Sequence, residues 1–231
     1  MEQSKTVAVL QPSYLPWLGY LDQIAKSDVF VFYDDVQYDK NGWRNRNRIR
    51  TGGPDGWSWL TVPVTATSHF PPICEVRVDE RAPWQRKHLK TLRAEYSRAP
   101  HLDLLDRHFG RLLDTLESSL ANVAIESVRA MMAALAIDTT LYRSSELDVP
   151  GDRNTRLLGI CKHFRATTYL SGEAARGYLD VPMFEREGIA VEFQSYHHPV
   201  YPQTREPFIS HLSAIDALLN AGSATRAFLG A

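Results

Sequence analysis

Two short, nearly continuous apolar runs lie near the N-terminus, with a helical stripe between them. Val7–Leu10 and Val29–Tyr33 are apolar and rich in β-branched or aromatic residues, and apolar positions recur at helical spacing from Trp17 to Lys26. This order of strand, helix and strand predicts a βαβ unit with parallel strands. Residues that follow both strands should therefore share the carboxyl edge of a sheet, where open α/β sheets bind ligands.

The remainder of the chain continues to alternate between the two periods. We expect further strands at 59–64, 73–78, 139–142, 167–170 and 189–194, and helices at 84–96, 102–120, 123–136, 154–164 and 213–220. This pattern predicts an α/β fold, a three-layer sandwich around a mainly parallel sheet, with an inserted helical segment at about 84–136. No repeat or flexible linker interrupts the chain, so we expect one domain over residues 1–231.

Composition and charge exclude several classes of protein. The 231 residues are 44% hydrophobic and 23% charged, which is typical of a globular protein and not of a disordered one. The formal net charge of -1 argues against binding to duplex nucleic acid. The chain has no apolar run of about 18 residues and no apolar leader, so we expect no membrane insertion and a cytoplasmic location.

The loop after the first predicted strand carries the first candidate site. Backbone N–H groups at the start of the following helix favour an anion. Gln11 and Tyr14 add neutral hydrogen-bond donors, and Trp17 and Tyr20 add faces for stacking. Gly19 would allow close backbone approach. The alternative is that these aromatic residues and prolines only stabilise a tight turn.

Two carboxylates, Asp34 and Asp35, follow the second predicted strand, and Gln37 and Tyr38 come directly after them. A carboxylate at a strand end can bind Mg²⁺, accept a proton or bind sugar hydroxyls. Successive strand residues alternate in direction, so one of the two should face the pocket. The alternative is a pair of solvated turn carboxylates.

The segment Gly42–Arg48 alternates arginine with asparagine after a tryptophan. Arginine forms bidentate contacts with phosphate or carboxylate, and asparagine both donates and accepts hydrogen bonds. The segment therefore predicts an anion-binding site, against the alternative of a solvated basic loop. The predicted ligand-binding residues here are Trp43, Asn45, Arg46, Asn47 and Arg48.

Three further residues complete the candidate site. His88 lies on the apolar face of a predicted helix, Ser171 follows a predicted strand, and His198 lies in the loop after the last predicted strand. Each has a plain structural alternative, as a packing histidine, a turn residue and a loop residue respectively. The spacing of histidines and cysteines predicts no metal site.

Several segments resemble the WbqC-like family almost from end to end, roughly from Val7 to Gly222. They are Gln11–Tyr20, Lys26–Tyr38, Asn45–Ile49, Trp59–Val64, Ser144–Leu147, Tyr169–Gly172 and Leu212–Asp216. Genes for such proteins commonly lie among those for bacterial O-antigen, other surface sugars or natural products. The resemblance implies a transferase-like step on a sugar or small metabolite.

A second, partial resemblance concerns the strand, turn and helix start at Val7–Tyr20. It is similar to the HIGH-motif nucleotidyltransferase and pantothenate-synthetase-like group, which implies a Rossmann-like (HUP-like) arrangement. The two histidines of that motif are replaced here by Trp17 and Tyr20. Because preorganised donors contribute about 10²–10³ each in rate, this replacement weighs against adenylyl transfer.

The leading hypothesis is therefore acyl or aminoacyl transfer to an amino group, with a sugar, nucleotide sugar or activated acyl donor as small-molecule partner. Gln11, Tyr14 and Asn47 would orient the acceptor, Arg46 and Arg48 would bind an anion, and Asp35 or Asp34 would accept a proton. The sequence identifies no cofactor with certainty, and a nucleotide with Mg²⁺ is left open. One alternative is a nucleotidyltransferase or ligase that uses a nucleotide with Mg²⁺, and another is a non-catalytic binding partner. A homodimer is left open.

Overall fold

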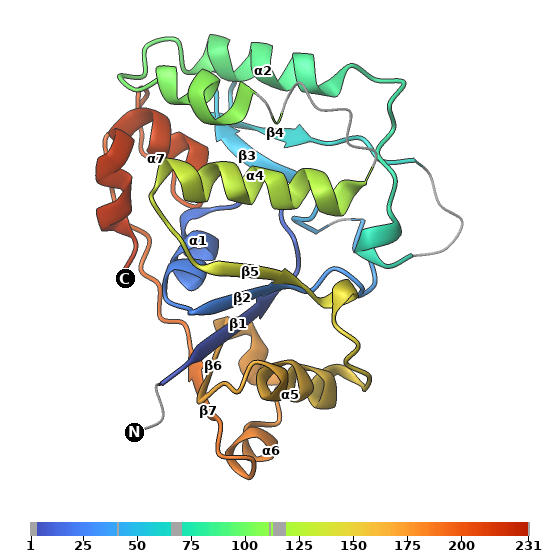
Figure 1. Ribbon diagram of the computed structural model, residues 1–231. Coiled ribbons are helices and arrows are strands. Elements are labelled where there is room, and N and C mark those ends of the chain that lie inside the picture. Colours follow the sequence, from blue (N-terminus) through green and yellow to red (C-terminus); the bar gives the residue numbers. More distant parts are fainter. Residues whose placement is uncertain (1–3, 41, 66–70, 111, 113–118, 231) are drawn as a thin grey trace.

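The computed structural model describes residues 4–40, 42–65, 71–110, 112 and 119–230 (Figure 1). A five-stranded parallel sheet lies at its centre in the order β5-β2-β1-β6-β7. Its strands are β1 (Thr6–Leu10), β2 (Val29–Phe32), β5 (Thr140–Arg143), β6 (Thr168–Ser171) and β7 (Ala190–Phe193). The chain runs outward from β1 to β2 and β5 and then returns to β6 on the other side. The topological switch point, where such sheets bind ligands, therefore lies between β1 and β6.

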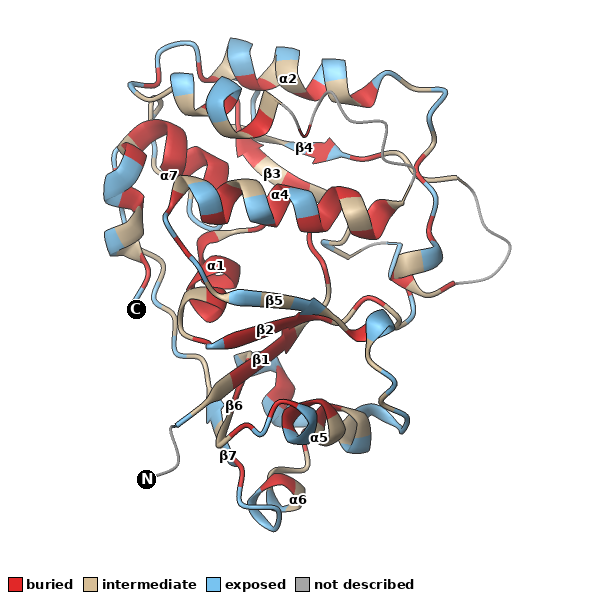
Figure 2. Ribbon diagram, in the orientation of Figure 1, coloured by how far each residue is buried: buried red, intermediate tan, exposed pale blue. Residues whose placement is uncertain are grey.

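The alternation of side chains along each strand divides the apolar residues between two cores. Ala8 and Phe30 contact the helices on one face, whereas Val9 and Val31 contact those on the other. The helices α1 (Leu18–Ala25), α4 (Leu120–Ala134) and α7 (Ala214–Ala221) cover the first face, and α5 (Arg153–His163) and α6 (Val181–Glu185) cover the second (Figure 1). The central strands are buried on both faces, as Figure 2 shows. This confirms the predicted three-layer α/β fold.

The predicted βαβ unit is present, with β1 and β2 paired in parallel from Val7↔Val29 to Leu10↔Phe32. The helix between them, α1, packs through Leu18, Leu21 and Ile24, which are fully inaccessible to solvent. Burial of each such side chain contributes about 1.5–3 kcal/mol, which explains why the stripe was visible in the sequence.

An antiparallel ribbon outside the main sheet was only partly predicted. It joins β3 (Arg46–Arg50) to β4 (Trp57–Thr61). We predicted a strand at 59–64 but no strand for the arginine-rich segment. The side chains of β3 nevertheless alternate as in other strands: Asn47 and Ile49 are buried, whereas Arg46 and Arg48 lie on the outer face.

The predictions for the middle of the chain were mixed. The strand predicted at 73–78 is wrong: residues Ile73–Glu75 form a 3-10 turn, because the two prolines before it cannot donate to a ladder. The helix predicted at 84–96 is α2 (Trp84–Glu95). Of the helix predicted at 102–120, a π-helical turn at Leu105–Phe109 is described, and positions 111 and 113–118 lie outside the described residues.

The helices of the predicted insert, α2 and α4, share one hydrophobic cluster with α1, α7, the ribbon and one face of the sheet. The helix α7 begins at Ser213, whose hydroxyl accepts from the Ile215 N–H, and ends at Gly222 with φ of 60°. Within the described part of the chain, no helix has the length and apolar character needed to cross a membrane.

Candidate functional site

Two adjoining cavities open at the carboxyl edge of the sheet. Cavity 1 has a volume of about 640 Å³ and lies between the ends of β1, β2 and β6 and the start of α5. Cavity 2 has a volume of about 580 Å³ and lies between the start of α1, the ribbon and the segments after β6 and β7. Both are lined by Leu10, Arg44, Gly172 and Ala174. The pair therefore occupies the switch point between β1 and β6, with Arg44 at the boundary.

The cavities bring together half of the predicted site residues. Cavity 1 is lined by Gln11, Gln37 and Ser171, and cavity 2 by Trp17, Tyr20, Trp43, Asn47 and Arg48. Eight predicted residues line neither cavity: Tyr14, Asp34, Asp35, Tyr38, Asn45, Arg46, His88 and His198. The catalytic and binding roles expected for all of these residues stay predictions. The cavities distinguish the eight residues that a bound ligand could contact from the eight that line neither cavity.

Arg44 has the most unusual environment of the residues that line the cavities. Its main chain is held by the loop after β1, since Ser13 Oγ donates to the Trp43 carbonyl at 2.8 Å and the Tyr14 N–H donates to the Arg44 carbonyl at 3.1 Å. Its guanidinium donates to the Gln11 carbonyl at 3.2 Å, while its buried Nε has no hydrogen-bond partner. Among the described ion pairs, none involves Arg44, and burial lowers its pKa. A cation in such a place is suited to bind an incoming anion.

Cavity 1 has a second basic wall at the start of α5. Arg156 and Arg153 both line it, and each guanidinium packs over a tyrosine, Tyr33 at 5.3 Å and Tyr178 at 4.7 Å. Arg156 also forms an ion pair with Asp35, which keeps the guanidinium at the cavity wall. Asp35 thus acts on cavity 1 through Arg156. The start of α5 is capped by Asp152, which lines the same cavity and accepts from the Thr155 N–H at 3.0 Å, so the positive charge of this wall comes from the two arginines.

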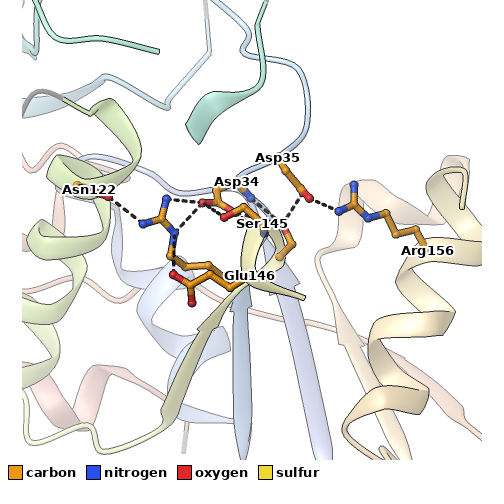
Figure 3. Close-up of polar contacts among 8 residues, drawn as sticks. Asp34, Asp35, Asn122, Ser145, Glu146 and Arg156 are labelled. Carbon is orange, nitrogen blue, oxygen red and sulfur yellow. Dashed lines mark hydrogen bonds and ion pairs between the residues drawn. The ribbon is translucent and has the colours of Figure 1, made fainter. Parts of the chain in front are cut away.

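Asp34 is the centre of a buried polar network that joins β2 to β5 (Figure 3). Its carboxylate is fully inaccessible and accepts from Arg143 Nε at 2.8 Å, from the Ser145 N–H at 3.0 Å and from Ser145 Oγ at 2.9 Å. Arg143 also donates to Asn122 at 2.9 Å, which ties α4 to the same network. Ser144 Oγ links the two acids, since it accepts from the Asp34 N–H and donates to Asp35 at 2.6 Å. The geometry gives Asp34 a structural role beneath the site.

Cavity 2 is the more aromatic of the two. The Trp17 indole lies over Gly19, so that a Cβ at position 19 would come within 2.3 Å of the ring. The close approach expected at Gly19 is thus present, and its partner is Trp17. Burial raises the pKa of Tyr20, whose neutral hydroxyl donates to the Gln11 carbonyl at 3.1 Å. Tyr196 completes this wall, with its ring 5.5 Å from that of Trp17.

His211, which was not among the predicted site residues, lines cavity 2. Its backbone has a φ of 57°, a left-handed conformation that costs a non-glycine residue energy and is concentrated at functional sites. Its N–H donates to His198 Nε2 at 3.1 Å, its carbonyl accepts from Arg48 at 3.2 Å, and its ring stacks on Trp17 at 5.3 Å. His198 therefore supports the position of His211 from behind.

Tyr14 and His88 contact each other in the core beneath the ribbon. The Tyr14 hydroxyl lies 3.0 Å from His88 Nδ1, and both rings pack against Trp84. The Thr61 backbone also forms a hydrogen bond with His88, and this bond opposes the effect of burial on the pKa of the imidazole. Burial lowers the pKa of His88 to about 4.

We expect this histidine to make the fold sensitive to acid. Because the pKa of His88 is lower in the folded state than the ordinary 6.5, the unfolded chain binds the proton first. The free energy of unfolding should fall by about 3 kcal/mol as the pH decreases from 6.5 to 4. Urea unfolding at several pH values measures this loss. The variant His88→Gln should show a flatter profile over that range, and parallel profiles for the two proteins would contradict the assignment.

The remaining predicted residues also lie outside the cavities. Asn45 donates to the Val62 carbonyl at 2.9 Å, which fixes the entrance to the ribbon, and Tyr38 is buried. No group of three or more His, Cys, Asp or Glu residues suited to a metal ion occurs in the described residues. Mg²⁺ at this edge would depend mainly on substrate phosphates, because Asp34 already accepts several hydrogen bonds.

The sequence reasoning missed Arg44, Arg153 and Arg156 as site residues. Arg44 lay within the segment chosen for its arginines, but period alone could not separate it from Arg46. Arg153 and Arg156 lie at the start of a helix, in the segment that follows a predicted strand. This position is the feature of the sequence that could have identified them as site residues.

Comparison with known proteins agrees with the resemblance noted above. The model of the WbqC-like protein family matches residues 11–227. A protein of Mycobacterium tuberculosis (strain ATCC 25618 / H37Rv) described as "Uncharacterized protein Rv1507c" is 34% identical over 221 residues, 95% of either chain. No solved structure matches the chain. The match covers both cavities, from Gln11 to the loop after β7, and the chain belongs to the WbqC-like protein family.

Proposed function

We propose that the protein is a transferase that forms an amide, by moving an acyl or aminoacyl group to an amino group of a sugar or small metabolite. The observation that carries this proposal is the place of Arg44, a buried guanidinium that takes part in none of the described ion pairs, at the boundary shared by two cavities of similar volume. A group-transfer reaction needs two neighbouring subsites and a charge-stabilising donor where they meet.

The walls of the cavities suggest which substrate each one takes. Cavity 1, with Arg153 and Arg156 at the start of α5, suits the anionic end of an activated donor. Cavity 2, with Trp17, Tyr20 and Asn47, suits a ring with hydroxyl or amino substituents. The surface-glycan or natural-product context implied by the family resemblance agrees with such an acceptor.

In the proposed reaction, the acceptor amine attacks the carbonyl carbon of the donor. A C–N bond forms, the bond to the leaving group breaks, and the amine loses a proton. Arg44 would donate to the oxyanion of the tetrahedral intermediate. Glu173 and His211 line cavity 2, and a carboxylate or an imidazole can serve as the general base, so these residues are better placed for proton transfer than Asp34.

A matrix of donors and acceptors tests the proposal. The protein would be incubated with acetyl-coenzyme A, acetyl phosphate or acetyl adenylate, each with glucosamine 6-phosphate or UDP-glucosamine, and amides would be detected by mass spectrometry. At least one pair should give an amide well above the rate without protein. If ligands raise the unfolding temperature but every pair is returned unchanged, the protein is a binding partner and the proposal is wrong. A requirement for ATP and Mg²⁺ would favour the nucleotide-dependent alternative.

A further inference from the structure

The outer face of the ribbon carries a cluster of tryptophan and arginine side chains, which we call the Trp–Arg face: Trp43, Arg46, Arg48, Trp57 and Trp59. Arg46 lies 4.4 Å from the Trp59 ring, and Arg48 lies 5.4 Å from Trp43 and 5.2 Å from Trp57. The ring centres of Trp43 and Trp59 are 5.1 Å apart, and those of Trp57 and Trp59 are 5.6 Å apart. The five side chains therefore form one continuous surface.

Packing of the ribbon does not account for this surface. The opposite face of the ribbon enters the core through Ile49 and Leu60, which are 0% and 4% exposed. On the outer face, Trp43 is 41% exposed and Trp59 is 37% exposed. Because these two large aromatic side chains are exposed, they do not contribute the free energy that burial of their rings would give. An exposed pair of aromatic rings is typical of a surface that binds a ligand.

The alternation of flat rings with guanidinium groups indicates the chemistry of that ligand. Arg48 donates to the His211 carbonyl, its buried Nε has no hydrogen-bond partner, and none of the described ion pairs involves it. Indole faces stack on nucleobases, and guanidinium groups beside them bind phosphates. With only five side chains and a chain of net charge -1, the surface suits a short ligand and not a polymer.

The Trp–Arg face is continuous with cavity 2. Trp43 and Arg48 belong to both, and the deeper part of the cavity adds the amides of Gln23, Asn47 and Gln194. A ring placed on Trp43 and Trp59 would thus have phosphate donors next to it and, beyond them, a chamber that combines aromatic walls with these three amides. This is the order of base, diphosphate and sugar in a nucleoside diphosphate sugar.

We propose that the acceptor is a nucleoside diphosphate sugar, with its base on Trp43 and Trp59, its diphosphate at Arg48 and its sugar in cavity 2. The inference deepens the proposed function by naming the acceptor class, and only the placement of the sugar rests on that function. Binding of the nucleoside diphosphate part requires no turnover.

Titration calorimetry with UDP, CDP, ADP, GDP and inorganic pyrophosphate tests the inference. At least one nucleoside diphosphate should bind tenfold or more tightly than pyrophosphate. Trp59→Ala should weaken that binding by about 5- to 100-fold, the range expected for loss of one stacked base. Trp59→Phe should retain most of the affinity, because it keeps a ring. Tyr142→Ala is the matched control, since Tyr142 is 39% exposed on the outer strand β5 and should leave the affinity unchanged.

The outcomes separate this inference from the proposed function. If none of the four diphosphates binds more tightly than pyrophosphate, or if folded Trp59→Ala keeps the affinity of the parent, the inference is wrong. If a nucleoside diphosphate binds through Trp59 but no amide forms with any donor, the binding site stands and the transferase proposal fails.

Discussion

Replacing Arg44 with methionine should abolish amide formation while the protein stays folded. Loss of a donor to an oxyanion typically lowers the rate by about 10²–10³. Methionine fills a similar volume without a charge, so it removes the cost of burying a guanidinium that takes part in none of the described ion pairs, along with the attraction between Arg44 and Asp39. The unfolding temperature should therefore be equal to that of the parent protein or higher. The rate with the best donor and acceptor pair, and the unfolding temperature, are the two measurements.

The variant Arg44→Lys is the informative control. It keeps the charge but loses the planar fork, so partial activity is expected if charge matters most and near-complete loss if bidentate geometry does. Neither substitution alters the Gln11 carbonyl, which accepts the hydrogen bond that orients Arg44. Full activity in Arg44→Met would refute the assignment of Arg44 to the reaction, whatever the stability of the variant.

Replacing Asp34 with asparagine should strongly destabilise the fold. The substitution is isosteric, but it removes the fully inaccessible carboxylate that pairs with Arg143 at 2.7 Å. Among the described ion pairs, the Arg143 guanidinium, whose side chain is 25% exposed, then keeps only the more distant Glu146 carboxylate at 3.9 Å. Breaking a buried ion pair by removing one partner typically costs about 3–5 kcal/mol. For a chain of this length the unfolding temperature should fall by roughly 10 °C. Thermal unfolding monitored by circular dichroism measures the change.

Two further variants show whether the loss comes from the unpaired charge. Asp34→Asn combined with Arg143→Met should recover part of the stability, because no charge is then left buried alone. Asp28→Asn, at the other end of β2, is the matched control, since Asp28 only accepts from the Thr6 N–H at 2.7 Å and an asparagine oxygen can do the same. Normal stability of Asp34→Asn with complete loss of transfer would instead support the catalytic role first expected for Asp34.

The two predictions address different layers of the same edge. Arg44 lies at the boundary of the cavities, where a substrate would contact it, and Asp34 lies beneath, where it joins β2 to β5. Asp35 lies between these layers, because it holds Arg156 against cavity 1 and accepts from Ser144. The sequence did not show which of the two acids faces the pocket, and their different partners lead us to expect a structural role for Asp34 and a positioning role at cavity 1 for Asp35.

Local sequence patterns were sufficient to predict the parallel sheet, most of its helices and the sheet edge at which the two cavities open. Apolar runs at Val7–Leu10 and Val29–Phe32 and the stripe in α1 are signals of local period, and burial of those side chains is what stabilises the fold. Local period failed where polar side chains dominate a strand, as in Arg46–Arg50, and where prolines prevent a ladder, as before Ile73.

Only the tertiary structure decided which polar residues reach the cavities. Tyr14 and Tyr20 lie in one segment, yet Tyr14 turns into the core toward His88 and Tyr20 lines cavity 2. The packing of α5 near the end of β1 places Arg156 at cavity 1, although Arg156 is more than a hundred residues from β1 in the sequence. Period within an element fixes which face a side chain takes, but the packing of separate elements fixes what that face meets, and that packing depends on contacts that no local pattern records.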